Sequence, residues 1–210
     1  MKALQERIED IREEVIAIHN LAQKSVQFCL YGLEGNEYAK KKVIQIEQIV
    51  DRMNTAVDCK CISSVALFQP LAKDLRFILS MVRISGNYER ITDLCGEIAM
   101  YTLDDSIAEV FGCFVKMKDK ILEMFDLLYV TLKTGSTKNL KDKLIKLDDI
   151  IDYYYVKSIE SLAKQVYQKD FEKLVDTILV AEHLERIGDI LTKTGSRYVF
   201  IEEGRRVWIK

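Results

Sequence analysis

Acidic side chains recur along the chain in pairs spaced four residues apart. The pairs that stand out are Glu47 with Asp51, Glu89 with Asp93, Asp148 with Asp152, and Glu185 with Asp189. On a helix, residues four apart lie about 40° apart on one face, so each pair would present its two carboxylates together. Carboxylate oxygens are the preferred ligands of hard cations, so this spacing points to metal binding as a candidate chemistry.

Two of these pairs, Glu89 with Asp93 and Glu185 with Asp189, belong to an internal repeat. Residues 87–93 read NYERITD, and residues 183–189 read HLERIGD, 96 positions later. Self-similarity at a fixed period is the mark of a duplicated structural unit. We therefore expect two tandem three-helix units, residues 1–103 and residues 104–210.

The distance of each pair from its nearest turn predicts that the pairs meet. Asp51 lies 18 residues before Gln69, and Glu89 lies 20 residues after it; Asp152 and Glu185 lie 16 and 17 residues from Gln168. On antiparallel helices, residues equidistant from the turn lie at one height. The sequence thus predicts two groups of four carboxylates, one in each repeat.

An isoleucine lies between the two acids of every pair. These residues are Ile49, Ile91, Ile150 and Ile187. A residue two positions along a helix points about 200° away, so the isoleucines are expected to face the core and the acids to face outward.

Two interpretations of the acidic groups remain open. Other pairs with the same spacing, such as Glu6 with Asp10, show that it also occurs on ordinary solvated faces, and Arg90 and Arg186 could neutralise their neighbouring acids. Alternatively, each group is a polynuclear site of hard oxygen ligands, suited to iron, manganese, magnesium or calcium and less well to zinc.

The composition predicts an all-α fold. The 210 residues include one proline and 9 glycines, too few turn formers for a sheet protein, while 49% hydrophobic residues can fill a core. Turn signals at residues 32–36, 69–70, 103–106, 134–136 and 168–170 divide the chain into six long helices. Long helices with short connections pack as antiparallel bundles.

The same composition excludes several classes of function. A net charge of −2 lacks the basic stripe of a nucleic-acid binder, and no apolar stretch is long enough to insert into a membrane. The acidic N-terminal segment does not resemble a signal peptide, so we expect a cytoplasmic protein. The five cysteines are expected to be reduced core thiols.

No catalytic arrangement is evident. A ferritin-like di-metal enzyme needs Glu-x-x-His, but Ile16 and Val180 stand three positions before His19 and His183. No nucleophile has a recognisable base, and no glycine-rich phosphate loop is present. We therefore expect no enzymatic activity.

At these motifs the sequence resembles the PhoU family of phosphate-uptake regulators. The resemblance rests on the duplicated Glu-Arg-Ile-x-Asp, on the QPLAKDLR segment at residues 69–76 and on the IEEG segment at residues 201–204. It implies two three-helix bundles whose acidic motifs bind multinuclear metal clusters, most often of iron. The implied ligands are Glu47, Asp51, Glu89 and Asp93 in the first cluster, and Asp148, Asp152, Glu185 and Asp189 in the second.

The resemblance also implies partners and a role. The family is known for binding the phosphate transporter's ATPase and the membrane sensor histidine kinase, and for negative regulation of the phosphate-starvation response; a homodimer is a further expectation. After Asp189 the family often reads Asp-His-Ala-x-Asn-Ile, whereas residues 190–194 here are ILTKT, which places Lys193 one turn beyond Asp189. This lysine could weaken metal binding in the second cluster.

Two other functions fit the same residues. The protein could be a regulatory subunit of another ion or phosphate transporter, because a fold does not choose the transporter. It could also be a metal-dependent hydrolase or oxidase that uses the same acidic groups.

Overall fold

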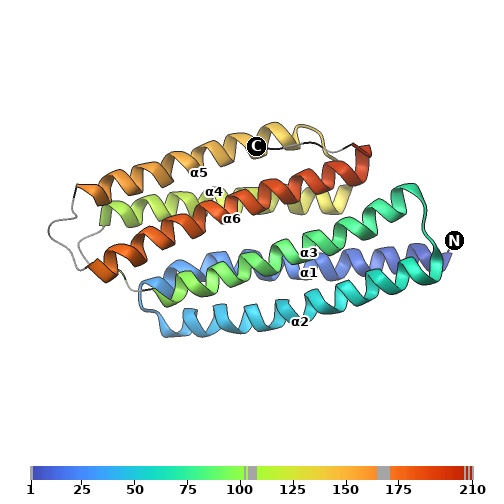
Figure 1. The fold of residues 1–210 in the computed structure, drawn as a ribbon, viewed down its shortest axis with the longest axis horizontal. Coiled ribbons are helices and arrows are strands. Elements are labelled where there is room, and N and C mark those ends of the chain that lie inside the picture. The colour runs from blue at the N-terminus through green and yellow to red at the C-terminus, as the bar shows by residue number, and fades with distance from the viewer. Residues whose placement is uncertain are drawn as a thin grey trace.

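The chain folds into six long α-helices in the computed structural model, which describes residues 2–101, 103, 108–164, 171–205, 207 and 209. The helices are α1 (Lys2–Leu33), α2 (Glu37–Phe68), α3 (Ala72–Met100), α4 (Ala108–Thr134), α5 (Leu140–Ala163) and α6 (Phe171–Glu203). These helices confirm the predicted all-α class, and Figure 1 shows how they are arranged. The expected breaks at 104–106 and 168–170 lie outside the described residues.

Local sequence sets the turn that aligns α2 with α3. Asn36 starts α2 by accepting a hydrogen bond from the backbone N–H of Ala39 at 3.0 Å. The helix ends where Gln69 adopts a left-handed conformation (φ 47°) and its N–H bonds to the carbonyl of Val65. Pro70 follows and cannot continue the helix. The chain therefore reverses direction at Gln69 and Pro70, and the acidic pairs of α2 and α3 lie at similar distances from this turn.

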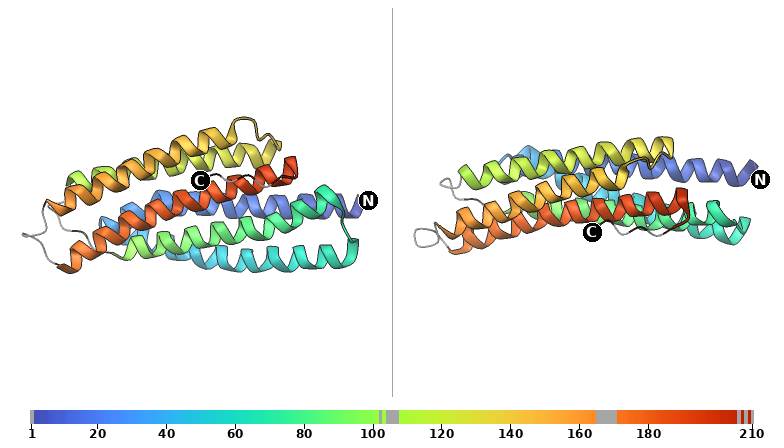
Figure 2. Two further views of the ribbon diagram at one scale, coloured as in Figure 1. Left: turned by 45° about the horizontal axis from the view of Figure 1, so that its top comes forward. Right: turned by 90° about the horizontal axis from the view of Figure 1, so that it is seen from above.

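The six helices form two bundles that share one core. α1, α2 and α3 pack together, as do α4, α5 and α6, and the two groups meet along α1 with α4 and α3 with α6. Figure 2 shows both groups lying lengthwise beside each other. Buried apolar side chains run continuously through both bundles. No helix among the described residues is long and apolar enough to cross a membrane.

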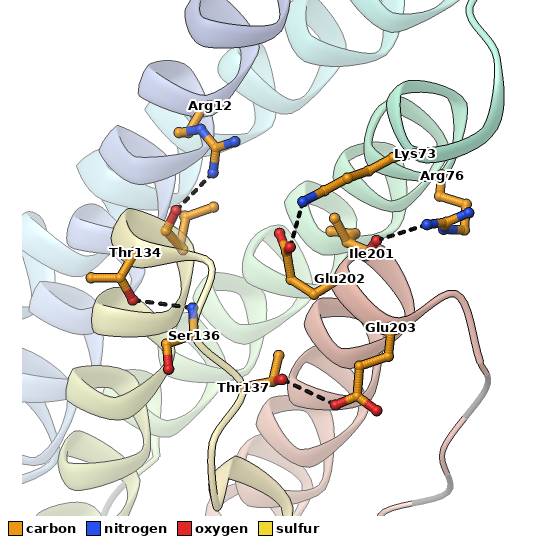
Figure 3. Close-up of polar contacts among 10 residues, drawn as sticks. Arg12, Lys73, Arg76, Thr134, Ser136, Thr137, Ile201, Glu202 and Glu203 are labelled. Atoms are coloured by element: carbon orange, nitrogen blue, oxygen red, sulfur yellow. Dashed lines mark hydrogen bonds and ion pairs between the residues drawn. The ribbon is translucent and has the colours of Figure 1, made fainter.

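Polar contacts join the bundles at one end (Figure 3). They are the Arg12 side chain donating to the carbonyl of Leu132 at 2.8 Å, Lys73 paired with Glu202 at 2.5 Å, and Arg76 donating to the carbonyl of Ile201 at 3.4 Å. Arg12 and Arg76 thus satisfy carbonyls near the C-terminal ends of α4 and α6, which have no partner within their helix. Side chains of the first bundle thereby donate hydrogen bonds to carbonyls at the helix ends of the second bundle.

A chain of buried polar side chains also links the bundles. His19 Nδ1 lies 2.9 Å from the hydroxyl of Tyr88, which lies 3.2 Å from the hydroxyl of Tyr198. The imidazole also packs edge-on against Phe125, with ring centroids 5.1 Å apart. Burial lowers the pKa of His19 from 6.5 to about 4. The histidine is therefore neutral at physiological pH.

The expectation for the cysteines holds for four of the five. All five are free thiols; Cys29, Cys61, Cys95 and Cys113 are buried. Cys59 is exposed, which corrects the expectation of a core position. It lies on α2 two residues before the buried Cys61, so the helix turns it to the opposite side.

Candidate metal centres

The structure brings the four predicted carboxylates of the first repeat together. Glu47 and Asp51 lie on α2, and Glu89 and Asp93 lie on the adjacent α3. Partial burial raises the pKa of Glu89, and the charges of Asp93, Asp51 and Glu47 raise it further, against a smaller opposing effect of Arg90. Carboxylates that repel one another in this way are close neighbours. Counting from the turn thus placed both pairs at one height.

A fifth carboxylate, which was not predicted, extends this group. Partial burial raises the pKa of Glu47, and the nearby charges of Asp93, Glu97 and Asp51 add to the shift. Glu97 lies one turn beyond Asp93, so the spacing of four residues continues from Glu89 to Glu97. This continued four-residue spacing was the signal in the sequence that could have identified Glu97 as a fifth carboxylate. We define the first cluster as Glu47, Asp51, Glu89, Asp93 and Glu97.

An open cavity adjoins the first cluster between α2 and α3. Its volume is about 500 Å³, and its lining is formed by Ile44, Glu47, Asp93, Gly96, Glu97, Met100 and Tyr101. His183 of α6 borders this region: its Nε2 lies 2.9 Å from Glu97 Oε2 and 3.3 Å from the hydroxyl of Tyr101. Burial lowers the pKa of His183, while the negative charge of Glu97 opposes that shift.

The second repeat also gathers its predicted carboxylates. Asp148 and Asp152 lie on α5, and Glu185 and Asp189 lie on α6. Partial burial raises the pKa of Glu185, and Asp189, Asp152 and Asp148 raise it further, while Lys193 lowers it. We define the second cluster as Asp148, Asp152, Glu185 and Asp189.

Lys193 contacts the second cluster directly. Its Nζ lies 2.9 Å from Asp189 Oδ2, one turn away on α6. This is the lysine that the sequence singled out as a competing charge. The arginines of the two repeats behave differently: partial burial raises the pKa of Asp93 and the charge of Arg90 opposes that shift, whereas Arg186 pairs with Glu182 at 3.7 Å.

The expectation that all acids face outward is wrong for Asp148, and the matching expectation for the isoleucines is wrong for Ile49. Asp148 is only 2% exposed, and Ile49 is 38% exposed. Asp148 lies against Gly188 of α6: a Cβ on that glycine would stand 3.6 Å from Asp148 Oδ1. A glycine on the neighbouring helix therefore makes room for a short acid that points inward. Ile91 and Ile187 are buried, as predicted, whereas Ile150 is only half-buried.

The donor chemistry of both clusters fits a hard cation. Every predicted ligand is a carboxylate, and like charges at this density are relieved when a cation binds. In the described residues, no three His, Cys, Asp or Glu side chains stand in a ligand arrangement. Binding would therefore require the carboxylates to turn towards one another.

These features define a class: duplicated three-helix bundles with an acidic cluster on each. A model of the PhoU domain matches residues 8–102 and 114–197. The chain is 37% identical, over the full length of both proteins, to a phosphate-specific transport system accessory protein PhoU homolog of Archaeoglobus fulgidus. It is 26% identical to a homolog from Thermotoga maritima, over 94% of this chain and 88% of the relative. The protein belongs to the PhoU family.

Solved structures agree with this fold. The crystal structure of PhoU from Pseudomonas aeruginosa superposes with a TM-score of 0.85 at 19% identity, covering 96% of this chain and 99% of that one. The phosphate transport system regulatory protein PhoU from Streptococcus pneumoniae gives a TM-score of 0.82 at 19% identity, over 98% and 99% of the two chains. At such identities the likeness shows the six-helix fold.

Proposed function

We propose that this protein is a non-enzymatic regulator of phosphate transport and of the phosphate-starvation response. The observation that carries the proposal is the full-length likeness to a relative named as an accessory protein of a phosphate-specific transport system. In this proposal the protein works in the cytoplasm and contacts the ATPase of the phosphate transporter and the membrane sensor histidine kinase. It keeps the starvation response off when phosphate is plentiful.

We further propose that both clusters bind cations, with iron first and manganese, magnesium, calcium or zinc as alternatives. The proposed ligands in the first cluster are Glu47, Asp51, Glu89 and Asp93. Those in the second cluster are Asp148, Asp152, Glu185 and Asp189. A bound cation supplies positive charge that offsets the repulsion among the carboxylates. The protein's own contribution is the alignment of two helices, which presents the acids at one height.

A non-catalytic role is consistent with the surroundings of the histidines. His19 is fully buried between the bundles, and His183 is engaged by Glu97 and Tyr101. A general acid or base must reach a substrate as well as the reacting proton. The acidic clusters are therefore proposed to act by binding cations and by the shape of the surface they form, without transferring protons to or from a substrate.

Affinity capture from the source cells, grown with and without phosphate, tests the proposed partners. The tagged full chain should recover the phosphate transporter's ATPase and the sensor kinase, identified by mass spectrometry. A Lys24→Glu variant, changed at an exposed position on α1, serves as a matched control and should recover both.

Other outcomes would assign the alternative functions. Recovery of subunits from a different transporter would replace phosphate transport with that system. Turnover of phosphate esters or dioxygen by the metal-loaded protein, lost in Glu89→Ala, would instead establish a hydrolase or oxidase.

A further inference from the structure

Of the two histidines in the chain, His183 lies beside the first cluster although it belongs to the second bundle. Its side chain is only 5% exposed, and its Nε2 lies 2.9 Å from Glu97 Oε2 on α3. Its Nδ1 is also buried and has no hydrogen-bond partner among the described residues. Because no acceptor or donor at Nδ1 fixes the tautomer, the ring proton can occupy Nδ1 and leave the Nε2 lone pair facing the cluster.

The separation of Nε2 and Oε2 suits two ligands of one cation. Imidazole nitrogens and carboxylate oxygens bind metals such as zinc at about 2.0–2.2 Å, so two of them at a right angle around the metal are about 3 Å apart. The observed 2.9 Å between His183 Nε2 and Glu97 Oε2 matches this spacing. A cation can therefore take the place of the hydrogen-bonded proton with little movement of either side chain.

Glu97 connects His183 with the rest of the first cluster. It lines the open cavity of about 500 Å³ together with Glu47 and Asp93. A cation beside Glu97 would thus face carboxylates from α2 and α3 and the imidazole from α6. The cavity has room for the water molecules that commonly complete the coordination of a metal.

The duplicated positions on the other side of the contact between α3 and α6 carry different chemistry. Subtracting 96 from His183 gives Asn87, and adding 96 to Glu97 gives Lys193. Asn87 donates a hydrogen bond across the same pair of helices to Thr194 Oγ1 at 2.9 Å. The contact between the bundles therefore pairs an imidazole with a carboxylate beside the first cluster, and has an amide and a lysine in the equivalent positions beside the second.

We propose that His183 is a nitrogen ligand of the cation in the first cluster, bound together with Glu97, so that both bundles hold this cation. The proposal rests on the proposed metal binding by the first cluster. Imidazole suits iron and zinc, whereas magnesium and calcium prefer oxygen ligands. The first cluster should consequently favour a transition metal more strongly than the second cluster, whose proposed ligands are all carboxylates.

Pulsed electron paramagnetic resonance of bound Mn²⁺ tests the ligand directly. The untagged full chain would carry Asp152→Asn with Glu185→Gln, which disables the second cluster, and its histidines would be labelled with ¹⁵N. In His19→Gln of this protein, His183 is the one remaining histidine. Mn²⁺ should then show the coupling of a directly bound ¹⁵N nucleus. The matched variant His183→Gln, which keeps His19, should lose that coupling.

Calorimetric titration of the same proteins measures the preference for a metal. His183→Gln should weaken Zn²⁺ binding at least about tenfold, because even residues that only orient a metal ligand cost that much when they are changed. Its affinity for Mg²⁺ should stay nearly the same, since magnesium gains little from a nitrogen ligand. His19→Gln should leave both affinities unchanged, and circular dichroism confirms that each variant is folded.

The possible failures separate this proposal from the metal binding on which it rests. Bound Mn²⁺ without histidine coupling, or equal weakening of Zn²⁺ and Mg²⁺ binding in His183→Gln, would overturn the nitrogen ligand and leave a cluster of carboxylates alone. Absence of any Mn²⁺ from the first cluster of the His19→Gln protein and of the protein that keeps both histidines would overturn both proposals.

Discussion

The two acidic clusters share one spacing but differ in the charge of the residue one turn beyond the repeated Glu-Arg-Ile-x-Asp motif. Asp93 is followed by Glu97, whereas Asp189, at the equivalent place 96 residues later, is followed by Lys193. Glu97 adds a fifth carboxylate to the first cluster, and Lys193 pairs with Asp189 in the second. The duplication thus kept four carboxylates in each repeat and reversed the sign of a neighbour. The second cluster already contains a cation of its own.

The clusters also differ in depth. Glu47 extends over Gly96 of α3, where an added Cβ would lie 2.5 Å from its Oε2, whereas Asp148 lies against Gly188 of α6. Gly188 is aligned with Thr92, one turn before Gly96, so the two repeats place their glycines differently. The same four-residue spacing therefore produces a group of half-buried and exposed acids in the first bundle, and a group that includes one buried acid, Asp148, in the second.

The largest expected effect is the loss of one whole cluster. Asp51→Asn with Glu89→Gln should empty the first cluster of metal and leave the second loaded. The two amides are neutral, so they attract a cation less than carboxylates do, and the repulsion that a bound cation would relieve is reduced. Elemental analysis of wild type and variant, purified without chelator and reloaded with iron or manganese, gives the metal stoichiometry. Equal metal content, or none in either protein, would show that the acids are ordinary solvated side chains.

The next largest effect is a loss of folding stability at low pH that comes from His19 in the first repeat. Tyr88, which contacts His19 in the first repeat, is aligned with Leu184 in the second. With a folded pKa near 4 and an unfolded pKa near 6.5, His19 takes up a proton more readily when the chain is unfolded. Its contribution to stability is therefore complete above pH 6.5 and declines as the pH falls towards 4. The total loss is on the order of 3 kcal/mol.

Urea unfolding of the metal-free protein at pH 7 and pH 4.5 measures this contribution. In His19→Gln the decline due to the imidazole should be absent, so the variant should lose about 2–3 kcal/mol less than wild type between the two pH values. The carboxylates titrate in both proteins, and their effect cancels in the difference. Identical losses would mean that the imidazole titrates alike in the folded and unfolded chains.

The smallest effect comes from exchanging the charges that distinguish the clusters. Glu97→Lys should weaken Mn²⁺ binding in the first cluster by roughly tenfold, and Lys193→Glu should strengthen it in the second by a similar factor, as expected for charges near a solvated site. Calorimetric titration measures each cluster in a protein whose other cluster is disabled, by Asp51→Asn with Glu89→Gln or by Asp152→Asn with Glu185→Gln.

Glu34→Lys and Lys24→Glu, both at exposed positions that belong to neither cluster, provide matched charge changes. They should leave both affinities nearly unchanged. If they shift the affinities as much as the changes at 97 and 193, the difference between the clusters reflects net charge alone, and the local comparison fails.

Much of the fold and the convergence of the acids could be predicted, because both depend on distances along the chain. When the turns between helices can be identified, counting residues from a turn gives the height of each residue along its helix. This count was enough to predict that Glu47 and Asp51 lie beside Glu89 and Asp93. The burial of Asp148 could not be predicted, since it depends on a glycine of another helix. The contacts among His19, Tyr88 and Tyr198 join positions 69 and 110 residues apart, for which spacing gives no signal.

The contact between the bundles has a consequence for how the repeats diverged. α1 meets α4 and α3 meets α6, so each helix of the contact faces its own duplicate. This is the pattern of a symmetric dimer, except that one polypeptide supplies both halves. In a true dimer, any substitution appears on both sides at once. Fusion removes that constraint, so that Glu97 and Lys193, or Tyr88 and Leu184, can evolve separately while the shared core stays closed.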